Sequence, residues 1–149
     1  MTLNLPQKQF NIKKDSQGKL IILDQLRRKF VALTPEEWVR QHFVAYLIDH
    51  RGFPAGLMAN EVSLTQNGIS RRCDTLVSDH NGHPILIVEY KAPSINITQN
   101  VFDQIVRYNM VLHATYLAVS NGMRHFCCRI NYESNSYAFL NEIPRYSDL

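Results

Sequence analysis

The segment that most constrains the fold is a helix predicted for residues 34 to about 50. Thr34 can cap its N-terminus, Pro35 suits its first turn, and Glu37 stands three residues after Thr34 in a capping-box pattern. Apolar side chains cover more than half of its circumference: Trp38, Val39, Phe43, Val44, Tyr46, Leu47 and Ile48. A helix of this kind is expected to be buried on more than one side and therefore to be central to the fold.

Strand-like segments and a second helix surround this first helix. Alternating or continuous apolar residues bounded by turn residues predict strands at 20–23, 61–65, 73–77, 85–91, 116–120, 123–130 and 137–140. A second helix is predicted from residue 96 or 98 to about 113. The order predicts an α/β (α+β) fold with a mixed central β-sheet flanked by α-helices.

The size and composition favour one globular domain. The chain has 149 residues, of which 45% are hydrophobic and 19% charged, which is enough for a single buried core. We expect residues 1–149 to form one domain, with residues 1–19 as an irregular arm and 20–149 as the core. The net charge of +3 mildly favours polyanions but does not by itself indicate nucleic acid.

The cysteines and the hydropathy pattern indicate a reducing, cytoplasmic setting. Cys73, Cys127 and Cys128 form no disulfide framework. A zinc site that includes His125 is conceivable, but no Cys-x-x-Cys pair occurs and adjacent strand cysteines point to opposite faces, so buried thiols are favoured. No segment approaches the roughly 18 consecutive apolar residues of a membrane span, and no membrane partner is expected.

A predicted hairpin brings charged residues together. Asn81 and Gly82 are typical of a tight turn between strands 73–77 and 85–91. If they are its two central residues, Asp74 faces Glu89, and such opposed residues share a face with Cβ atoms about 4.5–5.5 Å apart. Lys91 lies on that same face, two residues further along. A three-residue turn or a bulge would shift this register, so the pairing is a hypothesis.

Two carboxylates beside an amine suggest a particular chemistry. The carboxylates repel each other unless a cation lies between them, and Mg²⁺ or Mn²⁺ prefers such oxygen ligands. Lys91 could orient an attacking water or stabilise charge in the transition state. The simpler alternative is an ordinary cross-strand ion pair. Gln104 and Tyr108, one turn apart on the second helix, favour the site.

These residues resemble a known nuclease superfamily. Asp74, the run Glu89-Tyr90-Lys91 and the Gln104-to-Tyr108 pair are similar to PD-(D/E)xK nucleases, in the branch with a QxxxY helix after the catalytic strand. The similarity is greatest to N-terminal domains of type I restriction enzyme R proteins and covers roughly residues 20 to 125. Cys73 stands where the superfamily motif has proline.

The resemblance implies a restriction-endonuclease-like fold and roles for individual residues. Asp74 and Glu89 would bind metal, and Lys91 would serve the attacking water or the transition state. Glu37 is the preferred third acid, although the capping box explains it equally well, and Glu61 is the reserve. The metal ligands predicted in this way are Asp74, Glu89, Glu37 and Tyr90. The predicted DNA contacts are Gln104 and Tyr108, which also shape the catalytic site, together with Arg72 and Arg107.

The sequence therefore predicts metal-dependent hydrolysis of DNA phosphodiester bonds by a nuclease of a restriction system. The alternative is a DNA-binding or assembly module of a restriction-type complex with little activity alone. No Walker-type GxxxxGK[ST] motif occurs in the chain. A motor would be a separate subunit, as would methylase and specificity subunits.

Overall fold

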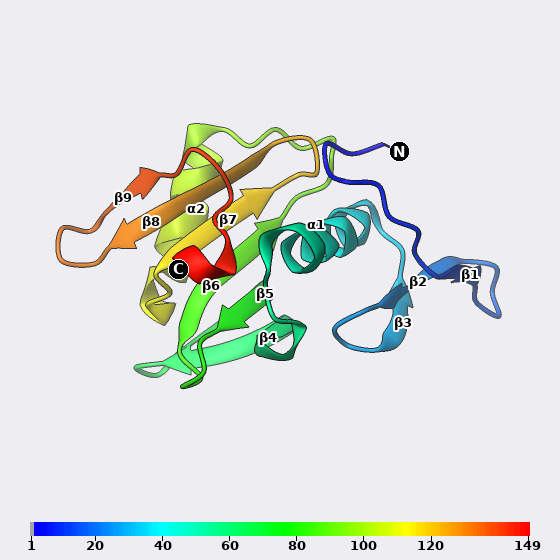
Figure 1. The fold of residues 1–149 in the computed structure, drawn as a ribbon, viewed down its shortest axis with the longest axis horizontal. Coiled ribbons are helices and arrows are strands. Elements are labelled where there is room, and N and C mark those ends of the chain that lie inside the picture. The colour runs from blue at the N-terminus through cyan, green and yellow to red at the C-terminus, as the bar shows by residue number, and fades with distance from the viewer. Residues whose placement is uncertain (1) are drawn as a thin grey trace.

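The computed structural model describes residues 2–149 and contains two β-sheets and two α-helices (Figure 1). The first sheet consists of β1 (Ile12–Lys14), β2 (Leu20–Asp24) and β3 (Lys29–Ala32). The second consists of β4 (Met58–Gln66), β5 (Ile69–Ser78), β6 (Pro84–Tyr90), β7 (Tyr116–Ser120), β8 (His125–Asn131) and β9 (Ser136–Phe139). The helices are α1 (Pro35–Arg51) and α2 (Gln99–Asn109), and short 3₁₀ turns lie at Ala55–Leu57, Met110–Leu112 and Tyr146–Asp148.

The larger sheet is mixed and lies between the two helices. Its strands follow the order β4-β5-β6-β7-β8-β9. The β6–β7 pair is parallel and its neighbours are antiparallel, because the chain crosses over through α2 between those two strands. In Figure 1, α1 lies in front of the sheet and α2 behind it. This arrangement confirms the predicted mixed sheet between helices.

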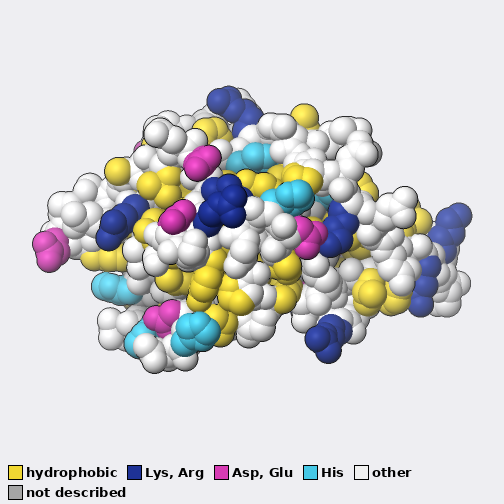
Figure 2. Space-filling model, in the orientation of Figure 1, with side chains coloured by type: hydrophobic (Ala, Val, Ile, Leu, Met, Phe, Trp, Pro, Cys, Tyr) yellow, Lys and Arg dark blue, Asp and Glu magenta, His cyan; other side chains and the backbone are white. Residues whose placement is uncertain are grey.

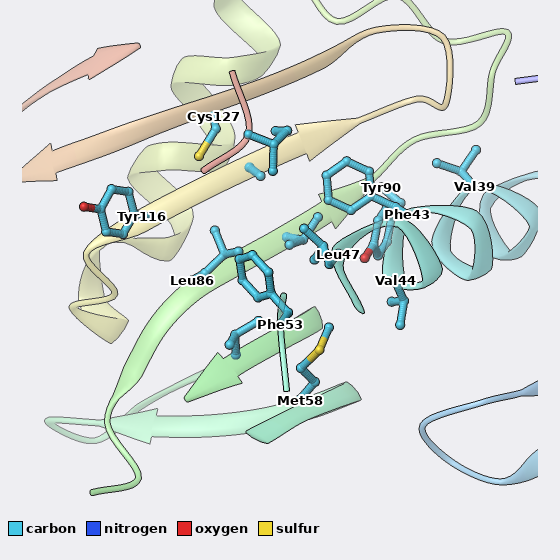
Figure 3. Packing of buried hydrophobic residues seen from close by; sticks show 14 of the residues in the cluster. Val39, Phe43, Val44, Leu47, Phe53, Met58, Leu86, Tyr90, Tyr116 and Cys127 are labelled. Carbon is cyan, nitrogen blue, oxygen red and sulfur yellow. The ribbon is translucent and has the colours of Figure 1, made fainter. Parts of the chain in front are cut away.

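Helix α1 forms as its capping pattern predicts. The Thr34 side chain accepts a hydrogen bond from the backbone N–H of Glu37, and Gly52 ends the helix in a left-handed conformation. Phe43 and Leu47 are fully buried and pack against strand residues such as Leu86 (Figure 3). Helix α1 is therefore buried against the sheet, as predicted.

Helix α2 covers the opposite face with a narrower apolar stripe. Phe102 and Val106 are buried in a second cluster that includes Ile87 and Leu117 from the sheet. Since both faces of β6 are covered, its apolar run is continuous rather than alternating. The helix is shorter than predicted, because its last turn tightens into the 3₁₀ segment Met110–Leu112.

The hairpin between β5 and β6 keeps the predicted register by a different route. The predicted two-residue turn is wrong: the loop closes between Asp79 and His83, and the Asp79 carboxylate accepts two backbone N–H groups within it. A bulge then shifts the register next to Ser78. The two offsets cancel, so Thr75 pairs with Val88 as the predicted turn would require.

The N-terminal region is more ordered than predicted. Strand β1 falls within the predicted irregular arm and pairs with β2, and β3 was not predicted. Leu3 is buried, and the backbone N–H of Asn4 donates to the carbonyl of Gly122. Met1, also part of that arm, lies outside the described residues.

The cysteines agree with the predicted buried thiols. Cys73, Cys127 and Cys128 are free thiols and all three are buried. Within residues 2–149, no helix has the length and apolar content that crossing a membrane requires.

Candidate active site

Asp74 and Glu89 lie next to each other where β5 and β6 separate. The paired register ends at Thr75 and Val88, one residue before this pair. Beyond it, the Asp74 carboxylate accepts the backbone N–H of Tyr90 at 2.9 Å. A side chain thus takes the place of a ladder hydrogen bond. This bond fixes Asp74 beside the end of the neighbouring strand.

Strand β4 is also distorted at this point. Its pairing with β5 is regular at Asn60 and again at Val62, but Glu61 between them has φ of 56°. A positive φ is unfavourable for a residue with a side chain and occurs mostly where the surroundings enforce it. The sheet is therefore irregular on both sides of Asp74.

Glu89 is held in a strongly shifted electrostatic environment. Burial, and after it the neighbouring Asp74, raise the pKa of its carboxyl to about 9, although the Lys91 ammonium acts in the opposite direction. One carboxylate oxygen, Oε1, is buried without a hydrogen-bond partner. The backbone N–H of Lys91 donates to the carbonyl of Ser120 at 2.9 Å, which fixes the chain beyond β6. The structure thus brings Asp74 and Glu89 together, and the ammonium of Lys91 lies near enough to act electrostatically on Glu89.

Similarity to known proteins identifies the family of the chain. Residues 35–144 match the family model described as type I restriction enzyme R protein N terminus. The chain belongs to this family. No curated protein matches the chain.

A solved structure supports the fold of this family member. It is a fragment assigned to the HsdR subunit of a type I restriction enzyme from Vibrio vulnificus YJ016, with a TM-score of 0.53 and 20% sequence identity. The match covers 76% of our chain and 24% of the HsdR fragment chain. At this identity the match establishes similarity of fold.

In this R protein N-terminal domain, Glu37 lies apart from the acid pair. Its carboxylate accepts hydrogen bonds from Arg27, Arg40 and Gln41 at 2.9 to 3.0 Å. Within residues 2–149, no group of three or more His, Cys, Asp or Glu side chains is placed to hold a metal. The predicted shell of three acids is therefore not formed, because the Glu37 carboxylate is hydrogen-bonded to two arginines and a glutamine.

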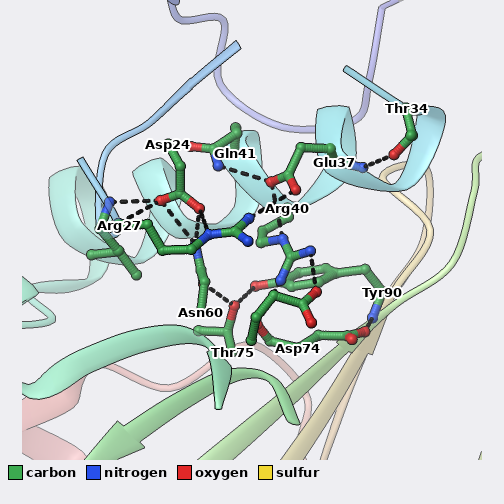
Figure 4. A network of polar contacts seen from close by, with 12 residues as sticks. Asp24, Arg27, Thr34, Glu37, Arg40, Gln41, Asn60, Asp74, Thr75 and Tyr90 are labelled. Carbon is green, nitrogen blue, oxygen red and sulfur yellow. Dashed lines mark hydrogen bonds and ion pairs between the residues drawn. The ribbon is translucent and has the colours of Figure 1, made fainter. Parts of the chain in front are cut away.

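Arg40 connects this network to the acid pair (Figure 4). It also donates to Glu61 at 2.6 Å and to the backbone carbonyl of Asp74 at 2.7 Å. Glu61 binds Arg72 through its other oxygen at 2.6 Å. Both candidates for a third acid are thus paired with arginines.

The side chain of Tyr90 points to the α1 face, away from the acids. Its hydroxyl donates to Thr75 at 2.8 Å, and Thr75 in turn donates to Asn60 at 2.6 Å. Asn60 donates to the buried carboxylate of Asp24. The prediction of Tyr90 as a metal ligand therefore fails for its phenol, since alternate strand residues face opposite sides of the sheet.

The predicted DNA contacts form an exposed border beside β5. Tyr108 is 48% exposed, and the guanidinium of Arg71 lies 4.4 Å from the centroid of its ring. Gln104 and Arg107 on the same helix are exposed, as is Arg72. These residues are accessible to a ligand. The structure does not bring Gln104 and Tyr108 into the buried part of the site.

The α1 side of the molecule has no dominant positive field. In Figure 2, Lys and Arg side chains on this face are scattered among acidic and histidine side chains. Helix α2, which carries Arg107, lies on the other side of the sheet.

Asn109 is a buried polar residue that the sequence reasoning missed. It is 2% exposed, lies beside Glu89 and donates from Nδ2 to the carbonyl of Ile105 at 2.9 Å. Its Oδ1 is buried without a hydrogen-bond partner. The signal was present, because Asn109 follows Phe102 and Val106 at helical spacing and is the polar member of that apolar stripe.

Proposed function

We propose that this chain is a divalent-metal-dependent DNA nuclease domain of a restriction system. The observation that supports this most directly is the meeting of Asp74 and Glu89 at the end of one hairpin, with Lys91 beside them. Membership of the R protein N-terminal family supports a restriction enzyme, and the resemblance to PD-(D/E)xK nucleases is consistent with the same three residues.

The acid pair fits a hard divalent cation. Two adjacent carboxylates and an unpartnered buried oxygen on Glu89 form an oxygen-rich site, and burial together with the Asp74 carboxylate raises the pKa of Glu89. Asp74 and Glu89 would hold Mg²⁺ or Mn²⁺. When bound, the ion would supply Lewis acidity and a more acidic water.

The other residues would position and stabilise the reacting groups. The backbone N–H of Tyr90 holds the Asp74 carboxylate in one orientation, which limits its freedom before any ligand arrives. The ammonium of Lys91 would bind a non-bridging phosphate oxygen and stabilise the negative charge that develops there during attack by water. The exposed arginines near α2 would contact the DNA backbone.

A plasmid cleavage assay tests this proposal. Wild-type protein with Mg²⁺ or Mn²⁺ should nick or cut supercoiled DNA, and Asp74→Ala and Lys91→Ala should each reduce the rate by about 100-fold or more. The matched control is Asp79→Ala, which removes an acid from the loop of the same hairpin and should leave the rate unchanged. Full cleavage by the Lys91→Ala variant would contradict the proposal.

A second candidate is a DNA-binding or assembly module that cuts only in a larger complex. It is favoured by one observation: the chain spans only 24% of the HsdR fragment chain that it resembles. Motor, methylase and specificity subunits would then be separate partners. Tight DNA binding without cleavage in either metal would favour this candidate.

A further inference from the structure

We propose that Asn109 is a positioning residue of the metal site, and that its carboxamide oxygen accepts a hydrogen bond from a water molecule on the ion held by Asp74 and Glu89. This inference rests on the proposed function and adds a residue to its site. The residue lies on α2, which otherwise contributes exposed side chains to this region.

The orientation of the Asn109 side chain is determined by its partner. The carbonyl of Ile105 can only accept a hydrogen bond, so the Asn109 atom that contacts it at 2.9 Å must be the NH₂ group. The carboxamide oxygen then points elsewhere, and it is buried. Because Ile105 lies one helical turn earlier, helix α2 itself fixes the direction of this oxygen.

Two unpartnered oxygens occur at this one place. Among residues 2–149, three buried side-chain polar atoms lack a hydrogen-bond partner, and two of them are Glu89 Oε1 and Asn109 Oδ1. A buried oxygen without a donor costs about 1–3 kcal/mol, so native proteins rarely leave one unpaired without a functional reason. The NH₂ group of Asn109 faces Glu89, because its hydrogen bond to that carboxyl lowers the pKa of Glu89. The unpartnered oxygen is on the same carboxamide, so one hydrated cation beside Glu89 can satisfy both oxygens.

A neutral oxygen suits this position better than a third acid. The site already holds two carboxylates, and only one cationic side chain, Lys91, acts on Glu89. A further buried negative charge would increase the repulsion that an ion has to offset. A carboxamide accepts a hydrogen bond from a metal-bound water without adding charge, as outer-shell groups in metal sites commonly do.

The test measures Mn²⁺ binding without DNA, by the electron paramagnetic resonance signal of the free ion. Asn109→Leu removes the oxygen and the amide donor, whereas Asn109→Asp keeps an oxygen and removes only the donor to Ile105. We expect Asn109→Leu to weaken Mn²⁺ binding by about 10-fold or more. Asn109→Asp should bind at least as tightly as wild type. In metal-free buffer Asn109→Asp should lose more Tm than Asn109→Leu, because it adds a third buried carboxylate in addition to losing the bond to Ile105.

The outcomes separate this inference from the proposed function. If Asp74→Ala abolishes Mn²⁺ binding but Asn109→Leu stays within twofold of wild type, the role of Asn109 is wrong and the nuclease proposal stands. Equal weakening in Asn109→Leu and Asn109→Asp would also overturn it, because a purely structural role would then explain both. Should Asn109→Leu not fold, Asn109→Ala gives the same comparison. Absence of any Asp74-dependent binding in the wild type would overturn both proposals.

Discussion

Arg40 donates a hydrogen bond of 2.7 Å to the backbone carbonyl of Asp74, whose carboxylate lies beside Glu89. The same guanidinium pairs with Glu37 and Glu61. Helix α1 therefore holds the backbone from which the Asp74 carboxylate projects.

Removal of the Arg40 guanidinium should strongly destabilise the domain. Arg40→Met leaves the carboxylates of Glu37 and Glu61 without their shared cation, and we expect the free energy of unfolding to fall by about 3 kcal/mol. Urea denaturation measures this loss. The control is Arg145→Met, an exposed arginine whose replacement should change stability by less than about 0.5 kcal/mol. A loss in Arg40→Met as small as that of the control would show that the network contributes little.

Removal of the Tyr90 hydroxyl should affect stability but not metal binding. Tyr90→Phe deletes the hydrogen bond to Thr75 in a buried network, which should cost about 1 kcal/mol. Mn²⁺ affinity and the cleavage rate should stay close to wild type, because the phenol points away from the acid pair. A large loss of Mn²⁺ affinity in this variant would restore Tyr90 as a side-chain ligand.

The stability of the metal-free protein should fall with rising pH because of Glu89. Its pKa is 4.5 in the reference state and about 9 when buried in the fold, so between these values the unfolded chain has lost a proton that the folded chain retains. The contribution of Glu89 to the free energy of unfolding is complete below about pH 4.5, and it is lost as the pH rises towards about 9. Urea denaturation at several pH values should show this slope in wild type and a flatter profile in Glu89→Gln.

Two comparisons strengthen the pH experiment. Glu142→Gln, which changes an exposed acid, should retain the wild-type slope. Mn²⁺ binding requires an ionised Glu89 and should therefore release a proton at neutral pH, which calorimetry in buffers of different ionisation enthalpy detects. Identical slopes in wild type and Glu89→Gln would contradict the assigned pKa shift.

The salt dependence of DNA binding should report contacts to phosphates. Arg107 is exposed, so Arg107→Ala should reduce the slope of log K against log salt concentration by about 0.9 if it contacts one phosphate. Arg72→Ala should change the slope less, because Arg72 is paired with Glu61. Fluorescence anisotropy with a short duplex measures both slopes. Lys14→Ala, in the separate small sheet, serves as control, and an equal change there would mean that binding is not localised to the α2 side.

The docked N-terminal segment should depend on the glycine of the β7–β8 turn. Gly122 has φ of 86°, and an added Cβ would lie 2.8 Å from a methyl group of Leu3. Gly122→Ala should destabilise the domain by more than the roughly 1–2 kcal/mol of the left-handed conformation alone. Gly18→Ala is matched in φ, at 80°, but its Cβ would meet nothing within 4 Å. Equal losses of Tm in the two variants would mean that the contact with Leu3 is unimportant.

The sequence predicted the local parts of this structure well. The capping box of α1 and the facing of Asp74 and Glu89 depend on residues close in the chain, where spacing and turn chemistry are informative. The register was correct although its derivation was not, because a longer loop and a bulge cancelled each other.

The parts that the sequence did not reveal depend on distant contacts. The pairing of Glu37 and Glu61 with Arg40 requires residues from α1 and β4 to meet, and no local pattern encodes that. The docking of Leu3 at Gly122 likewise joins the N-terminal segment to the β7–β8 turn. Asn109 is of the same kind, because its contact with Glu89 joins helix α2 to strand β6.

The parallel β6–β7 pair sets the order in which the site can be assembled. Asp74 and Glu89 meet as soon as one hairpin closes, but Lys91 is anchored to Ser120, and that strand pairs with β6 only after the α2 crossover is in place. An isolated copy of the hairpin, transplanted into another scaffold, would carry the two acids but would lack the hydrogen bond to Ser120 that fixes the backbone of Lys91. Any attempt to move this chemistry to a new protein would have to include the whole segment from β5 through β7.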